Sequence, residues 1–395
     1  MKKLTTTFLL ISVLCGFISA QNQLESVKKC WGDSISDYTI PIKSLTSSDF
    51  NDLQFLKKIL TDKKYVFIGE SSHQVEEFYQ LRARLINFLV SELDFKVIAF
   101  EHEKIMCVKP NNIKNNIELD SLLSFYYNSR MINSDSEGGM TLMELIAKSD
   151  IETTGFDIQF SGSNPNRFRI ITQKYIKGIP DSVFYHDSLF CCNNYDRKNL
   201  LDEWNIVMQQ VEINEQDKIA KEIRKNLENR INWLSFLPFK TQDIRDSLMA
   251  ENITWLIRNI YPDEKIIFLA HNEHINKLNF NFTCMGELLP DTLMNESYVL
   301  GLTAYQGTTG LLIGQTVSLP GNKRNSLESI LNSAGYDYVF CDFSKQIPLK
   351  NNSWMFEKIK RQSRVRSHQQ IIPNKFFDGI IQIKSVNATS FDIIN

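Results

Sequence analysis

Residues 65–73 read Tyr-Val-Phe-Ile-Gly-Glu-Ser-Ser-His, an apolar run that ends in a polar cluster with Glu70 and His73. A helical pattern follows over about residues 75–93, where apolar side chains recur every three or four positions and form one stripe. A second apolar run, residues 96–100, then leads directly to Glu101. A strand, a helix and a strand in this order predict a βαβ unit, because two parallel strands need a long crossover connection.

Similar runs recur along the chain and predict further strands at residues 152–157, 265–270, 298–305, 338–342 and 378–384. Most are continuous apolar runs, which is typical of strands that are covered on both faces. We therefore expect an α/β fold with a mainly parallel central sheet flanked by helices.

The middle of the chain has a different character. From about residue 161 to 260 it is rich in Asn, Lys, Glu and Gln at helical spacing, with few strand signals. No Gly/Ser-rich linker and no sharp change of composition separates this region from its flanks. We expect a helical insertion or lid within one domain that spans residues 21–395.

The first twenty residues have the pattern of a secretory signal peptide. Lys2 and Lys3 precede a short apolar run, residues 8–18, and Ser19-Ala20 offers a cleavage point before Gln21. A membrane span needs about 20 apolar residues, so this run is short for an uncleaved anchor, which is the competing interpretation. The expectation is a soluble protein that is exported to the periplasm or secreted, without stable membrane insertion after cleavage.

The overall composition excludes one class of partner and leaves the cysteines open. The chain has 44 basic and 46 acidic residues, whereas a nucleic-acid surface usually needs a marked basic excess. Six cysteines would remain in the mature chain: Cys30, Cys107, Cys191, Cys192, Cys284 and Cys341. They permit disulfides in an oxidising compartment, but their spacing matches no metal site, and buried or incidental thiols are the simpler interpretation.

Acidic and imidazole side chains gather at the ends of the predicted strands. Glu70, Glu101, Asp157 and His271 each stand at or just past the carboxyl end of one strand, and His274 follows three residues after His271. In open parallel sheets, ligands bind outside these ends. If the strands are neighbours, the side chains project toward one crevice.

The residue types in this crevice suit hydrolysis. His73 could take a proton from water while a carboxylate such as Glu70 orients the ring and stabilises its charged form. Arg82, at the border of the apolar stripe, could pair with a carboxylate or bind an oxyanion. A capping glutamate, a surface histidine and an ordinary ion pair are the structural alternative.

A metal site is a second possibility at the same place. Glu70, His73, Glu101, His271 and His274 offer ligands that zinc accepts, yet they would serve equally well without a metal. The sequence lacks the His-Glu-x-x-His pattern of zinc peptidases, the G-x-S-x-G elbow of serine hydrolases, and the phosphate-binding glycine loops.

Several blocks, in order between about residues 65 and 382, resemble the erythromycin esterase-like family. They are Gly69-Glu70-x-x-His73 with Glu77-Phe78 and Leu81-Arg82-Ala83-Arg84-Leu85, then Phe100-Glu101, Gly155-Phe156-Asp157-x-Gln159, Arg245-Asp246-x-x-Met249-Ala250-Glu251-Asn252, Ala270-His271-Asn272-x-His274, Met285-Gly286, Gly301-Leu302 and Phe377-Asp378-Gly379.

The resemblance implies a role for each site residue. His73 matches the general base, Glu70 and Glu101 the acids beside it, Arg82 the neighbouring arginine, and His271 with His274 the second histidine pair. Asp157 and Gln159, from the third block, would bind substrate.

The implied reaction is direct attack of water on a small-molecule ester or macrolide-like lactone, without an acyl-enzyme or a cofactor, and it suggests antibiotic resistance. Two alternatives stay open: a metal-dependent peptidase or amidase-like hydrolase, and a non-catalytic binding protein of the cell envelope.

Overall fold

The computed structural model describes residues 31–107, 136–159, 165–239, 241–310, 315–363 and 367–389. The predicted signal peptide, residues 1–20, and Cys30 lie outside these ranges.

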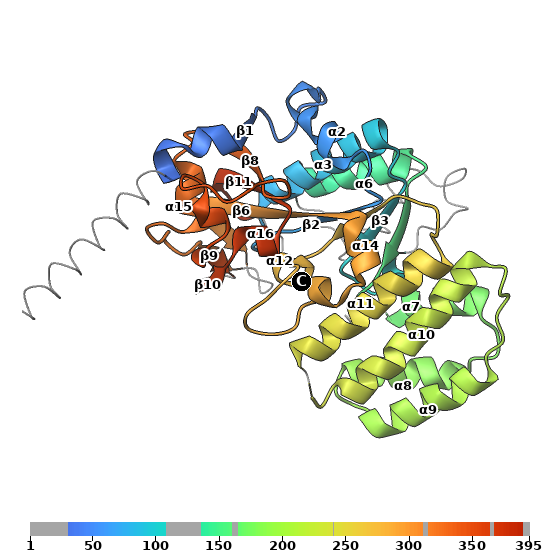
Figure 1. The fold of residues 1–395 in the computed structure, drawn as a ribbon. Coiled ribbons are helices and arrows are strands. Elements are labelled where there is room, and N and C mark those ends of the chain that lie inside the picture. The colour runs from blue at the N-terminus through green and yellow to red at the C-terminus, as the bar shows by residue number, and fades with distance from the viewer. Residues whose placement is uncertain are drawn as a thin grey trace, which may run out of the picture.

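The core of the molecule is a nine-stranded sheet, as Figure 1 shows. Its strands follow the order β1 (Thr39–Ile42), β8 (Tyr338–Asp342), β11 (Gly379–Val386), β6 (Ser297–Gly310), β2 (Tyr65–Ile68), β5 (Ile266–Leu269), β3 (Val97–Phe100) and β4 (Glu152–Gly155), and β7 (Thr316–Ser318) pairs with β6. Neighbours from β11 to β4 are parallel, whereas β1, β8 and β7 pair antiparallel. The predicted α/β fold with a mainly parallel sheet is confirmed.

Five of the seven predicted strands have bounds that differ by one to five residues in the structure, and the hydrogen bonds explain the change in two of them. The strand expected at residues 152–157 ends at Gly155, because the next two N–H groups bond to the carbonyls of Phe100 and His102 at the end of β3. The strand expected at residues 298–305 continues to Gly310, where β7 pairs with its far end.

Helices cover both faces of the sheet, as expected for continuous apolar strands. On one face lie α2 (Phe55–Leu60), α3 (Glu76–Leu93) and α6 (Glu137–Lys148), and the apolar stripe of α3 is buried against the sheet. The other face packs against α11 (Gln242–Asn259), α14 (Asp291–Asn295), α15 (Leu327–Asn332) and α16 (Pro373–Phe376).

Shorter elements complete this part of the molecule. They are η1 (Ile35–Tyr38), η2 (Asn51–Leu53), α4 (Lys104–Cys107), α12 (Asn272–Ile275), α13 (Met285–Leu288), η4 (Ser353–Met355) and the hairpin of β9 (Ile359–Ser363) and β10 (Ser367–Ile371).

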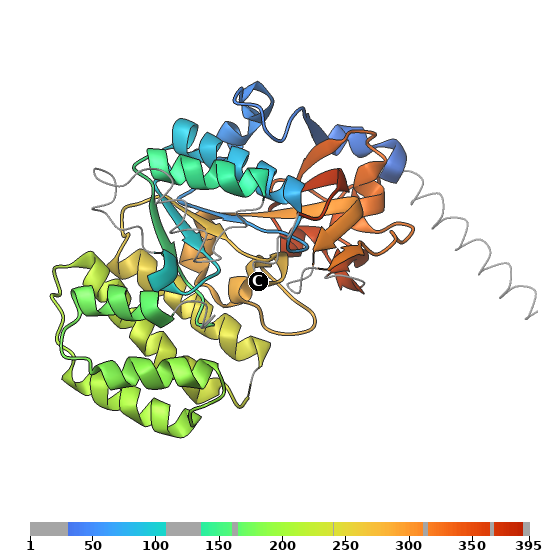
Figure 2. The ribbon, with the colours of Figure 1, turned by 180° about the vertical axis from the view of Figure 1, so that it is seen from behind.

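Between β4 and β5 the described part of the chain forms a block of four helices, within the region of about residues 161–260 where the sequence predicts a helical insertion. The block contains α7 (Pro165–Tyr175), α8 (Asp181–Cys191), α9 (Arg197–Gln210) and α10 (Lys218–Phe236), which lie beside the sheet in Figure 1 and, from behind, in Figure 2. The block has an apolar core of its own around Trp204. The chain returns from it through α11, which packs against the sheet.

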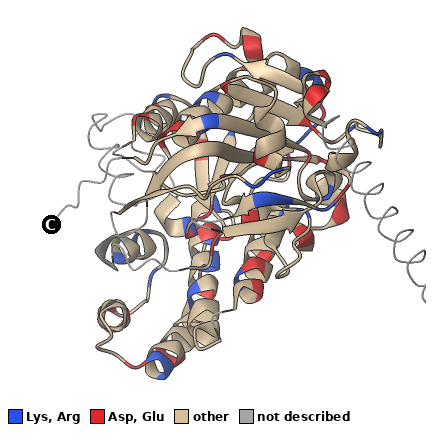
Figure 3. Ribbon diagram, turned by 90° about the vertical axis from the view of Figure 1, so that its left-hand side faces the viewer, with Lys and Arg blue, Asp and Glu red and all other residues tan. Residues whose placement is uncertain are grey.

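Charged residues of both signs are spread over the molecule, and the described cysteines are thiols. Lysine, arginine and acidic residues alternate over the helices and around the sheet in Figure 3, without a face of one sign in that view. Within the described ranges, none of the helices combines the length and hydropathy that crossing a bilayer requires. Five cysteines are described as thiols: Cys107, Cys284 and Cys341 are buried, and Cys191 and Cys192 are exposed.

Candidate active site

The order β2-β5-β3-β4 places four predicted side chains along one edge of the sheet. These strands are parallel neighbours, and each is followed within one or two residues by a polar side chain: Glu70, His271, Glu101 and Asp157. The tips of β2 and β5 approach each other so closely that only glycine fits at position 69. A Cβ atom there would lie 1.9 Å from the side-chain oxygen of Asn272. The four side chains that the sequence predicts to face one crevice therefore follow the carboxyl ends of neighbouring strands.

At the tip of β2, Glu70 links His73 and Arg82. One carboxylate oxygen lies 2.7 Å from Nδ1 of His73, and the other accepts a hydrogen bond of 2.8 Å from Nη1 of Arg82. Arg82 also donates to the carbonyl of Ala270, 3.0 Å away, so its guanidinium points to the strand tips. Glu70 caps no helix, because α3 begins at Glu76 without a side-chain cap.

This arrangement leaves one nitrogen of His73 available. Burial raises the pKa of Glu70, but the charge of Arg82 and the hydrogen bond from His73 outweigh it and lower the pKa. The carboxylate is therefore ionised and can only accept, so Nδ1 of His73 carries the proton and Nε2 is the basic nitrogen. The side chain of His73 is 52% exposed, so a water molecule can approach.

Glu70 also tunes the basicity of this ring. Burial lowers the pKa of His73, yet the hydrogen bond and charge of Glu70 raise it above its ordinary value. His73 is thus a base that gains a proton readily near neutral pH.

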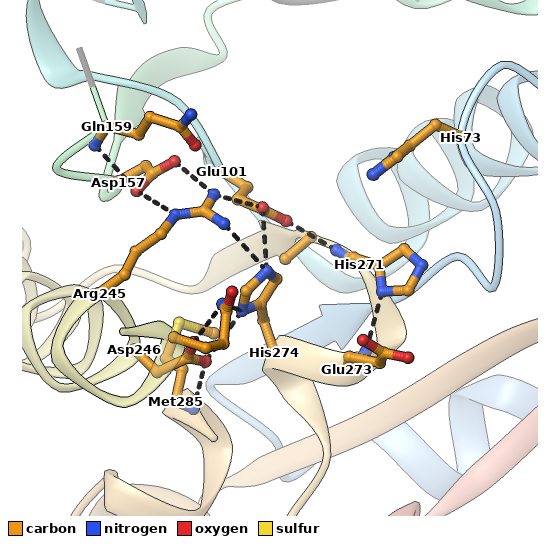
Figure 4. A network of polar contacts seen from close by, with 12 residues as sticks. His73, Glu101, Asp157, Gln159, Arg245, Asp246, His271, Glu273, His274 and Met285 are labelled. Carbon is orange, nitrogen blue, oxygen red and sulfur yellow. Dashed lines mark hydrogen bonds and ion pairs between the residues drawn. The ribbon is translucent and has the colours of Figure 1, made fainter. Parts of the chain in front are cut away.

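His271, at the tip of β5, carries its ring proton on the other nitrogen from His73. Its Nδ1 accepts a hydrogen bond of 3.2 Å from the backbone N–H of Glu273 in the first turn of α12, so the ring proton lies on Nε2. Burial and the neighbouring His73 lower the pKa of His271 to about 3, which keeps the ring neutral. The rings of His73 and His271 have centroids 5.1 Å apart, and Figure 4 shows them near each other. A basic nitrogen and a neutral N–H donor therefore share this side of the site.

The second half of the site centres on Glu101, at the tip of β3. One oxygen accepts a hydrogen bond of 2.7 Å from Arg245 and lies 3.3 Å from Nε2 of His274. The other oxygen accepts a hydrogen bond of 2.8 Å from the backbone N–H of His271. Burial raises the pKa of Glu101, but the charge and hydrogen bond of His274, with Arg245, hold it well below its ordinary range. Glu101 is a permanent anion that ties β3 to the start of α12.

Asp157 and Gln159, the predicted substrate-binding residues, have internal contacts. Arg245 donates to both oxygens of the Asp157 carboxylate, at 3.0 and 2.6 Å, and the backbone N–H of Gln159 donates to the same group at 3.1 Å. Asp157 is buried and Gln159 is exposed. Asp157 thus holds Arg245, and the Gln159 side chain stands at the surface.

Two residues of this network, Arg245 and Asp246, had no assigned role from the sequence. Both lie on α11, and Asp246 accepts a hydrogen bond of 2.8 Å from Nδ1 of His274 (Figure 4). The signal that could have found them is their adjacent opposite charges within the block Arg245-Asp246-x-x-Met249, of which Asp246 and Met249 are buried.

Most of the donor atoms considered as metal ligands from the sequence have partners within the protein. Nδ1 and Nε2 of His274 face Asp246 and Glu101, Nδ1 of His271 accepts from the backbone, and both oxygens of Glu70 are paired. In the part of the chain that the structure describes, no three His, Cys, Asp or Glu side chains are grouped to hold a metal ion. This geometry does not fit the metal centre considered from the sequence.

Comparison with known proteins adds a family to this geometry. The family model described as erythromycin esterase matches residues 209–386. The chain is 26% identical to a Bacillus subtilis protein named putative hydrolase YbfO, over 98% of each chain. It is 24% identical to erythromycin esterase type II of Escherichia coli, over 90% of this chain and 97% of the relative.

Solved structures share the fold. One titled succinoglycan biosynthesis protein has a TM-score of 0.73 at 18% identity, covering 93% of this chain and 99% of that one. A mutant of erythromycin esterase EreC in its open conformation has a TM-score of 0.68 at 18% identity, covering 90% of this chain and 99% of that one. The resemblance seen in the sequence blocks is confirmed.

Proposed function

We propose that this chain, which belongs to the erythromycin esterase-like family, hydrolyses a carboxylic ester or lactone by direct attack of water, with His73 as the general base. The observation that carries the proposal is the pairing of His73 with the ionised Glu70, which leaves Nε2 as a basic nitrogen beside the neutral ring of His271.

The first step forms the new carbon–oxygen bond. A water molecule at Nε2 of His73 gives up a proton to that nitrogen while its oxygen attacks the carbonyl carbon. Glu70 stabilises the imidazolium that results, because its oxygen lies 2.7 Å from Nδ1. The tetrahedral intermediate carries its negative charge on the former carbonyl oxygen.

His271 stabilises that oxyanion. Its Nε2–H is the free donor of the ring, and a preorganised donor in a buried site lowers the barrier substantially. Arg82 acts indirectly in this scheme, since its donors hold Glu70 and the carbonyl of Ala270. The intermediate then collapses, the bond to the leaving oxygen breaks, and the alkoxide takes the proton from His73.

The substrate class and location follow from different observations. A macrolide-like lactone is the proposed substrate, supported by the relative named erythromycin esterase type II, and opening such a ring would make the protein a factor in antibiotic resistance. The signal-peptide pattern of residues 1–20 supports export to the periplasm or the medium, where small esters would be met before entry into the cytoplasm.

The test is a substrate screen with the purified mature protein. We expect hydrolysis of aryl esters and of a lactone, with the acid and alcohol products identified by mass, no mass added to the protein during turnover, and equal rates with and without a chelator. Turnover confined to peptides and lost with the chelator would favour the metal-dependent peptidase. Failure to turn over any of these substrates would favour the non-catalytic binding protein.

A further inference from the structure

Asp246 is a fully buried carboxylate that stands on a helix, not at the end of a strand. Its exposed fraction is 0%, and it lies on α11, the helix by which the chain returns from the helical block. Burying a carboxylate is costly unless donors surround it. The donors around Asp246 therefore indicate what it does.

Three donors converge on this carboxylate. One oxygen lies 2.8 Å from Nδ1 of His274 and 2.7 Å from the backbone N of Met285, and the other accepts from Nε2 of Gln242 at 2.6 Å. Met285, the backbone donor, belongs to α13, and Gln242 belongs to the first turn of α11. Asp246 is thus held rigidly with one lone pair directed at the imidazole.

The imidazole of His274 stands between two carboxylates. Nδ1 faces Asp246 and Nε2 lies 3.3 Å from Glu101, and an ionised carboxylate only accepts hydrogen bonds. Both ring nitrogens therefore carry protons. Among the described residues, Arg245 and Gln242 of α11 also lie 3.4 Å from the ring nitrogens, and the centroid of the His271 ring lies 6.5 Å from that of His274. Burial lowers the pKa of His274, but Glu101 and Asp246 raise it to about 10.

Glu101 connects His274 to the backbone of His271, on the side of the site where the reaction is proposed to occur. The oxygen that does not face His274 accepts from the backbone N–H of His271, and His271 carries the donor aimed at the oxyanion. A buried chain of contacts thus runs from Asp246 through His274 and Glu101 to His271, as the dashed lines in Figure 4 trace.

We infer that Asp246 is a positioning residue for the proposed hydrolysis: it keeps His274 doubly protonated, so that His274 fixes Glu101 and, through Glu101, the backbone of His271. The inference rests on the proposed function for its kinetic consequences. It assigns His274 a fixed positive charge, in contrast to the neutral His271 three residues before it.

The first test is kinetic and uses Asp246→Asn, which removes the charge and keeps an acceptor for Nδ1. We expect kcat for an ester to fall by about tenfold to a hundredfold with KM little changed, because small misplacements at a site cost rates of this order and Asp246 does not meet the substrate. The rate of the variant should fall further between pH 7 and 9, as His274 loses its proton, while the rate of the parent protein does not.

Asp243→Asn is the matched control for this variant. Asp243 lies on the same helix, is exposed, and accepts from the backbone N–H of Thr283 at 2.8 Å, outside the chain of contacts. It should keep the parent kcat and pH profile. An Asp246→Asn variant that is folded and keeps the parent profile overturns the inference, and so does an equal loss in Asp243→Asn.

The second test needs no enzymatic activity and separates this inference from the proposed function. In the ¹⁵N spectrum of the histidine-labelled full protein at pH 8, assigned with His274→Gln, both ring nitrogens of His274 should have imidazolium shifts. Neutral shifts for His274 in the parent protein overturn the inference, even if esters are hydrolysed. Imidazolium shifts without turnover on any ester support it while contradicting the proposed function.

Discussion

Replacing His73 with alanine should abolish most ester hydrolysis while leaving the protein folded. A positioned general base contributes roughly 10²- to 10⁴-fold, so kcat should fall by about that factor. The side chain is 52% exposed and fills no core position, so the unfolding temperature should change little. Initial rates on an aryl ester and a thermal melt of the same preparation measure both effects.

The chain offers a matched control for this substitution. His186, on α8, pairs through Nδ1 with Glu203 at 2.9 Å, as His73 pairs with Glu70, but it belongs to the helical block. His186→Ala should keep the parent rate. If His73→Ala is folded and retains more than half of the parent kcat, the assignment of the general base is wrong.

Replacing His271 with asparagine should have an effect of similar size for a different reason. Asparagine can still accept from the backbone N–H of Glu273 and start α12, but its side chain is shorter, so its own N–H group does not extend to the position of the histidine Nε2–H. Loss of one such donor costs roughly 10²- to 10³-fold in kcat, and KM should change less, because the donor acts mainly in the transition state.

Two results with His271→Asn would contradict its role as the oxyanion donor. His271 is neutral near pH 7 because its pKa is low. Its loss should therefore not shift the acid limb of the pH profile to higher pH. A folded His271→Asn protein with the parent kcat would show that the oxyanion donor lies elsewhere. A change in KM alone would make His271 a substrate-binding residue.

Much of the architecture was predictable from the sequence because it depends on local patterns. The apolar stripe of α3 between two apolar runs predicted the βαβ unit, and the structure pairs β2 and β3 with β5 between them, all parallel. The rule that parallel strands end at one edge placed Glu70, Glu101 and His271 together before any contact was known. The pairing of Arg82 with a carboxylate was one of the two roles considered for it.

The parts of the site that depend on tertiary contacts were not predictable. Arg245 is 144 residues from Glu101 and 88 from Asp157, and no periodicity links them. Asp157 is expected from the sequence to bind substrate, but in the structure α11 supplies Arg245 to its carboxylate. The resemblance groups His271 and His274 as one histidine pair, whereas their partners in the structure make the first ring neutral and the second charged.

The central claim, that Glu70 and His73 form the base that activates water, is tested most directly by the pH dependence of kcat/KM in the parent protein and in Glu70→Gln. His73 must be neutral to accept a proton, so the rate falls as pH drops through its pKa, which lies above the ordinary 6.5 in the parent protein. Glutamine removes the charge that raises this pKa. We predict a lower maximal rate and an acid limb at lower pH in Glu70→Gln; an acid limb at the same pH in both proteins would contradict the account.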